Sequence, residues 1–99
     1  MDIKMLKFKN KLTVELDGKL DANSAPELEA KIEPELKNTA ILIFDMQKLT
    51  YISSAGLRVL VFALQTLDAH GGTMRIENAS DDVKQVFSLT GLLKVFDIK

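Results

Sequence analysis

The feature that most restricts the fold is an unbroken apolar run in the middle of the chain. Residues 40–46 read Ala-Ile-Leu-Ile-Phe-Asp-Met and are apolar up to Asp45. Such a run is typical of a strand whose two faces are both covered by helices, because neither face then carries alternating polar residues. We therefore predict a buried central strand at residues 40–46, in a sheet whose parallel strands are connected through helices.

Strand patterns also occur on both sides of this run. Alternation of apolar and polar residues, together with bounding turn residues, indicates strands. The further strands are predicted at residues 2–8, 11–16, 73–77 and 94–98. Asn10 joins the first two of them, and Gly18 is expected to end the second. Residues 47–53 are predicted to form a loop.

Helical spacing and capping residues indicate three helices between these strands. The helices are predicted at residues 24–33, 54–69 and 80–91. Ser24 and Glu27 form a capping box at the first, and Pro34 is expected to shorten its last turn, because proline cannot donate a backbone hydrogen bond. The order ββαβαβαβ predicts one α/β domain over residues 1–99, with a mixed, mainly parallel sheet of four to five strands.

Composition excludes several classes of function. The 13 basic and 14 acidic residues are interspersed, so no basic stripe is available for nucleic acid. The apolar runs are far shorter than the ~20 residues that a membrane span needs, which predicts no membrane insertion and a cytoplasmic location. With no cysteine and the single histidine His70, we expect no metal site and no cofactor.

Two segments are expected to meet where the parallel strands end, since partners bind such sheets at that edge. Residues 18–24 contain Asp21 and Asn23, and residues 45–54 contain Asp45, Ser53 and Ser54. The two carboxylates have three possible roles: bracing their loops, helping to present a serine hydroxyl, or serving as metal ligands or acid–base groups.

Ser54 is predicted to cap the second helix, with its hydroxyl at the positive helix end and open to a kinase. Gly56 would let another chain approach the helix closely. The simpler alternative is that Ser54 only caps and Gly56 only permits tight packing. An enzymatic alternative uses Ser54 as a nucleophile with Asp21 or Asp45, since His70 lies sixteen residues on, roughly 24 Å along the helix.

The second helix also offers a surface. Its expected core positions are Leu57, Leu60, Val61, Leu64 and Leu67, and its expected outer positions are Arg58, Phe62, Gln65 and Ala69. An apolar Phe62 on the outer side has two explanations. Either another segment covers the ring, or the ring anchors a protein partner beside Arg58.

Motifs spread over the whole chain resemble the STAS-domain anti-sigma factor antagonists. The segment Asp-Met-Gln-Lys-Leu-Thr-Tyr-Ile-Ser-Ser-Ala-Gly-Leu-Arg-Val-Leu at residues 45–60 carries the resemblance. It extends to Gly-Lys-Leu-Asp at 18–21, Ala-Pro-Glu-Leu at 25–28, the glycine pair at 71–72 and Phe-Ser-Leu-Thr-Gly-Leu at 87–92.

The resemblance implies partner switching. The unmodified antagonist binds an anti-sigma factor serine kinase and thereby releases the sigma factor, phosphorylation ends the binding, and a serine phosphatase is the expected opposing enzyme. The phosphorylated serine carries over to Ser54, and Ser53, which replaces an acidic residue common in the family, is a competing acceptor. Asp21, Asn23, Asp45 and Gly56 then belong to the expected partner surface. A STAS subunit of a lipid-transport or other membrane complex, without phosphorylation, is the alternative.

Overall fold

Strands and helices follow one another in the order ββαβαβαβ that the sequence predicts. The structure is a computed structural model and describes residues 1–99. The strands are β1 (Asp2–Phe8), β2 (Lys11–Leu20), β3 (Ile41–Ile52), β4 (Thr73–Glu77) and β5 (Asp97–Ile98). The helices are α1 (Ala25–Leu36), α2 (Ser54–Asp68) and α3 (Asp81–Leu89).

The five strands form one mixed sheet in the order β1-β2-β3-β4-β5. Only the β1–β2 pair is antiparallel, and the other three pairs are parallel. The predicted mixed, mainly parallel sheet is therefore confirmed, with β3 at its centre. None of the three helices combines the length and apolar character needed to cross a bilayer.

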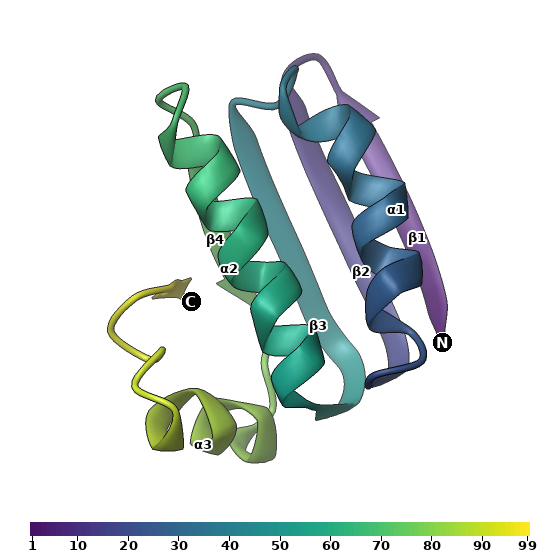
Figure 1. Ribbon diagram of the computed structural model, residues 1–99, viewed down its shortest axis with the longest axis vertical. Helices are drawn as coiled ribbons and strands as arrows, with labels where there is room; N and C mark the ends of the chain where they lie inside the picture. Colours follow the sequence, from purple (N-terminus) through teal and green to yellow (C-terminus); the bar gives the residue numbers. More distant parts are fainter.

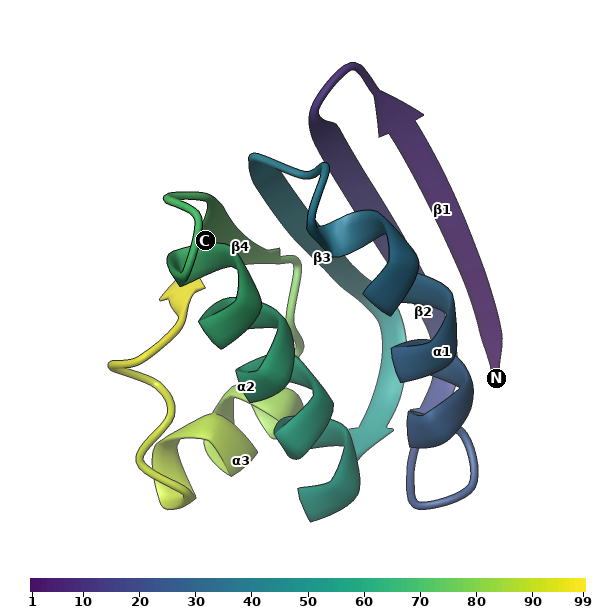
Figure 2. The same ribbon diagram turned by 45° about the horizontal axis from the view of Figure 1, so that its top comes forward.

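Helices α1 and α2 lie side by side over the same face of the sheet (Figure 1; Figure 2). The alternation along β2 follows from this, since Leu12, Val14 and Leu16 are at most 1% exposed beneath the helices. The opposite face is open, so the expectation of helices on both faces of β3 is wrong. Ile41 is 41% exposed there, and Ile43 is buried between its strand neighbours Thr13 and Arg75.

The two central strands are longer than predicted. Gly18 does not end β2, and residues 47–52 form strand instead of the predicted loop. Pairing continues to Leu20 opposite Ile52, through two shifts of register, and Gly18 has a φ of +114° in this stretch. The glycine accommodates an irregular strand here, because its backbone tolerates positive φ.

Helix α1 departs from prediction at both ends. The Ser24 side chain makes no capping hydrogen bond, so the predicted capping box with Glu27 is wrong. The helix also passes through Pro34 and ends at Leu36. Leu36 is fully buried and Pro34 is exposed, so packing holds the last turn in place while solvent can reach the carbonyl that the proline leaves without a donor. At the other end of the chain, the last strand is shorter than predicted, with only two residues.

Candidate functional site

Strands β2 and β3 end side by side, which brings the two predicted site segments together. Leu20 pairs with Ile52, and the Ser53 N–H donates a 2.9 Å hydrogen bond to the Leu20 carbonyl. Asp21 follows Leu20 and Ser54 follows Ser53, so both residues lie next to this hydrogen bond. Figure 2 shows the starts of α1 and α2 at this same end of the molecule. The two segments meet where the strands end, as expected, although residues 45–52 of the second segment are strand.

Helix α2 begins with two serines that have different roles. Ser53 is the N-cap residue, and its Oγ accepts a 3.3 Å hydrogen bond from the Gly56 N–H. Ser54 is the first helical residue and is exposed. The prediction that Ser54 caps the helix is therefore wrong by one position. Because the neighbouring serine performs the capping, the Ser54 hydroxyl is left at the helix start facing solvent.

Gly56 faces the interior. A Cβ placed on this residue would lie 2.7 Å from Leu20 Cγ and 3.1 Å from Ile52 Cγ1. Real Cβ atoms do not approach other carbons so closely, so the glycine lets α2 sit tightly on the ends of its own β2 and β3. The tight-packing explanation thus fits Gly56, and the idea that it admits a partner chain does not.

The segment between β2 and α1 is braced by Asp21 and Ser24. Asp21 Oδ1 accepts hydrogen bonds from the N–H groups of Asn23, at 2.9 Å, and Ser24, at 3.1 Å. The bond from the Ser24 N–H is the main cause that lowers the pKa of Asp21, followed by the bond from Asn23. Ser24 Oγ in turn donates to the Lys19 carbonyl at 2.8 Å. Loop bracing is the role that this geometry gives Asp21, while the Asn23 side chain is exposed.

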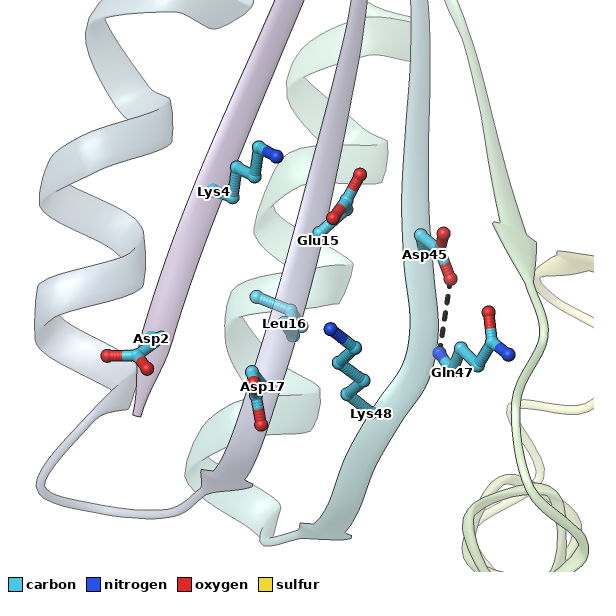
Figure 3. A pocket seen from close by; sticks show the side chains of 8 residues that line it. All are labelled: Asp2, Lys4, Glu15, Leu16, Asp17, Asp45, Gln47 and Lys48. Atoms are coloured by element: carbon cyan, nitrogen blue, oxygen red, sulfur yellow. Dashed lines mark hydrogen bonds between the residues drawn. The ribbon is translucent and has the colours of Figure 1, made fainter.

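Asp45 lies away from the serines. It sits within β3, opposite Glu15 and Glu77, on the open face of the sheet (Figure 3). Its Oδ1 accepts from the Gln47 N–H and from Asn78 Nδ2, both at 3.1 Å. Six residues of strand lie between Asp45 and Ile52, roughly 20 Å of chain. The expectation that Asp45 joins Asp21 beside Ser54 is wrong, because β3 continues where a loop was predicted.

A shallow groove of about 300 Å³ runs between the starts of α1 and α2. Its lining residues are Ala22, Ala25, Pro26, Glu29, Ala55, Arg58 and Val59. Arg58 is exposed, and Phe62, one turn further along α2, is partly buried against the core. The rest of the fold thus covers part of the Phe62 ring, as the first explanation expects.

Sequence spacing misplaced part of the α2 core. Val59 and Ala63 are buried, whereas Val61 and Leu64 are only partly buried. The reason is that α1 packs along one side of α2 (Figure 1; Figure 2), where Val59 faces the groove between the two helices. The groove residues of α1, such as Glu29, were missed for the same reason, since only the pairing of the two helices brings them to the site.

The enzymatic alternative requires a base beside Ser54. His70 follows the far end of α2, where its Nε2 lies 2.9 Å from the Thr39 carbonyl oxygen. Asp21 directs Oδ1 to backbone N–H groups, and Asp45 lies on another face. No three His, Cys, Asp or Glu side chains gather as a metal site would require. The residues proposed for catalysis are therefore not assembled around Ser54.

The STAS domain family model matches residues 2–99. An anti-sigma-B factor antagonist of Bacillus subtilis is 33% identical over 89 residues, which cover 90% of this chain and 82% of the relative. The chain belongs to the STAS-domain anti-sigma factor antagonist family. A second relative, the anti-sigma-B factor antagonist of Listeria monocytogenes, is 30% identical over 83% of this chain and 73% of its own length.

Solved structures show the same fold. The unphosphorylated form of the anti-sigma factor antagonist SpoIIAA superposes with a TM-score of 0.88 at 21% identity, covering 99% of this chain and 88% of that one. The phosphorylated form of SpoIIAA, a Bacillus cell fate determinant, gives a TM-score of 0.80 at 20% identity, covering 99% and 91%. The predicted STAS-like fold is confirmed.

Proposed function

We propose that this STAS protein is an anti-sigma factor antagonist controlled by phosphorylation of Ser54. In its unmodified form it binds an anti-sigma factor serine kinase, which then releases its sigma factor. The names of the relatives support the antagonist role. The observation that carries the switch is the exposed Ser54 hydroxyl at the first position of α2, left free because Ser53 caps the helix.

Ser54 is a better acceptor for phosphate than Ser53. The Ser53 side chain is only partly exposed, and its oxygen already accepts from the Gly56 N–H. A kinase would have to break that cap before it could reach Ser53, whereas Ser54 needs no such rearrangement. Ser53 is therefore the second candidate for modification.

The phosphate would act on the partner. It adds about −1.5 to −2 charge and three acceptor oxygens. The α2 N-terminus favours this charge, so the fold itself tolerates the modification. A partner surface shaped for a neutral hydroxyl would instead meet a bulky dianion next to the ionised Asp21, and each 1.4 kcal/mol of penalty weakens binding about tenfold.

The groove between the two helix starts extends this surface. The exposed Arg58 lines it, the exposed Asn23 follows its lining residue Ala22, and Phe62 lies further along α2. We infer that these side chains contact the kinase around Ser54, while Gly56 contributes only by holding the helix in place. Asp45 belongs to this interface only if the partner also reaches the open face of the sheet.

In the same proposal the protein is cytoplasmic and is not itself an enzyme. It is the substrate of a kinase and of an opposing serine phosphatase. The alternative is a STAS subunit of a lipid-transport or other membrane complex that is not phosphorylated. The two functions differ in one measurable step. Only the antagonist should accept phosphate from a cognate kinase.

The test combines intact mass with binding to a cognate anti-sigma factor kinase. With ATP, the wild type and Ser53→Ala should each gain one phosphate, and Ser54→Ala should gain none. Ser54→Asp should bind the kinase at least tenfold more weakly than wild type, equivalent to about 1.4 kcal/mol. Phosphorylation that persists in Ser54→Ala, or equal binding by Ser54→Asp and wild type, contradicts the proposal.

Two variants separate binding from folding. Ser53→Ala should lose about 1 kcal/mol of stability through its cap and still be modified. Phe62→Ala should weaken kinase binding if the ring is an anchor, and Gln65→Ala, on the same helix and exposed, is its matched control. Unchanged affinity of a folded Phe62→Ala would remove the ring from the interface.

A further inference from the structure

The hairpin formed by β1 and β2 concentrates positive charge. Residues 4–11 read Lys-Met-Leu-Lys-Phe-Lys-Asn-Lys, with four lysines and no acidic residue. The remaining nine basic residues of the chain face fourteen acidic ones. A chain of net charge −1 thus has a cationic hairpin end, residues 4–11, and an anionic remainder, and this distribution orients the molecule toward an anionic partner.

The same hairpin exposes apolar side chains. Phe8 is 64% exposed, Leu6 46% and Ile41, on the nearby β3, 41%. Strand pairing places Phe8, Lys11 and Ile41 in one row on the open face of the sheet, and Leu6 stands two residues from Phe8 on that face. Large apolar side chains among lysines are typical of surfaces that dock at a lipid–water boundary.

The turn contains a residue that costs stability. Lys9 has a φ of +56°, in the left-handed region that favours glycine or asparagine, and its Nζ lies 5.5 Å from the centre of the Phe8 ring. A lysine at this position is disfavoured by the backbone. Local strain of this kind is often found where a side chain serves a function, and here it places a cation at the tip of the hairpin.

Neighbouring elements extend the positive end. The Asn10 carbonyl accepts hydrogen bonds from the Ala40 and Ile41 N–H groups, and a shared hollow links Asn10 with Lys37 and His70. Lys7 is paired with Glu35 at 2.9 Å, which leaves Lys9, Lys11 and Lys37 without an acidic partner.

The acidic row of the open face lies away from the hairpin turn. Asp45 and its strand neighbours Glu15 and Glu77 form a row across the middle of the open face. An anionic surface would repel this row, so contact is confined to the hairpin end. Three unpaired lysines without a longer stripe of positive charge fit an anionic lipid surface better than they fit a nucleic acid.

We propose that the β1–β2 hairpin docks this protein on membranes that contain anionic lipids. Phe8 and Leu6 enter the headgroup layer, and Lys9, Lys11 and Lys37 contact the lipid phosphates. The whole length of β3 separates the turn of the hairpin, at Lys9 and Asn10, from the start of α2 (Figure 2), so membrane docking leaves Ser54 open to a partner. This role does not depend on phosphorylation and is a peripheral, reversible attachment.

Sedimentation of the full chain with vesicles tests the proposal. We expect binding to phosphatidylcholine vesicles that contain phosphatidylglycerol, little binding to phosphatidylcholine alone, and release at high salt. Lys9→Asn/Lys11→Gln and Phe8→Ser should each weaken binding on the order of tenfold. Lys19→Gln/Lys94→Gln and Leu89→Ser should bind like wild type, because these exposed residues lie away from the hairpin turn, Lys19 at the far end of β2.

Three results would overturn the proposal. The first is sedimentation that does not depend on phosphatidylglycerol. The second is unchanged binding by the lysine variant, which should remain folded because asparagine suits the left-handed turn at position 9. The third is self-association of the wild type that Phe8→Ser abolishes, without any vesicle binding, since the exposed face would then be an interface between two copies.

Discussion

Two serines stand at helix starts on the same edge of the sheet, and only one is available to a kinase. Ser24, before α1, is 8% exposed, and its Oγ accepts from the Asp21 N–H and donates to the Lys19 carbonyl. Ser54, at the start of α2, is exposed, and Ser53 makes the capping bond. Position at the edge is therefore not sufficient for a modification site. The hydroxyl must also be free of structural duties.

The largest effect on folding should come from Gly56, which fixes the start of α2. Gly56→Ala would place a Cβ 2.7 Å from the buried Leu20 Cγ. We expect a loss of about 1–3 kcal/mol of unfolding free energy, because overpacking outweighs the better helix propensity of alanine. Urea unfolding measures it, with the exposed Ser54→Ala as the control. A more stable Gly56→Ala would show that α2 is not held by this contact.

Exchanging each serine for alanine tests the comparison itself. Ser24→Ala removes the hydroxyl that bridges Asp21 and Lys19, and should cost about 1–2 kcal/mol of stability. Ser54→Ala should change stability by no more than about 0.5 kcal/mol, since its hydroxyl is exposed and caps nothing.

The two variants should behave in the opposite way toward a kinase. A folded Ser24→Ala should still accept one phosphate, and Ser54→Ala none, as intact mass would show. Equal loss of stability in both variants would mean that the Ser54 hydroxyl also braces the fold, and the distinction between the two serines would fail.

Most of the fold was predictable because local patterns and packing agree. The order of elements, strand 73–77 and the helix capped by Ser80, whose Oγ accepts from the Val83 N–H, follow from alternation and capping residues. The open face of the sheet was not predictable, because Ile43 is buried by neighbouring strands and looks in the sequence like a residue beneath a helix.

The site was predictable in part. Its location and its exposed serine follow from the order of elements. Two details were predicted wrongly: Ser53 caps the helix instead of Ser54, and Asp45 lies on another face. Both errors have one cause. Residues 47–52 were expected to form a loop, but pairing with the end of β2 keeps them extended. Long-range pairing of this kind leaves little trace in a single segment of sequence.

The smallest expected effect concerns Asp21 and pH. Bonds from the N–H groups of Ser24 and Asn23 lower the pKa of Asp21, so the carboxylate is favoured in the folded state. Its contribution is complete above the unfolded pKa of about 3.9 and is lost as the pH falls through the lower folded value. Asp21→Asn should therefore flatten the acid limb of the stability curve, measured by urea unfolding from about pH 6 downward.

Asp45→Asn is the matched control, since its carboxylate lies outside the braced loop. If both variants lose stability in parallel with the wild type as the pH falls, Asp21 does not brace the loop through its charge, and the rigid setting of Ser24 must come from the Ser24 hydroxyl alone.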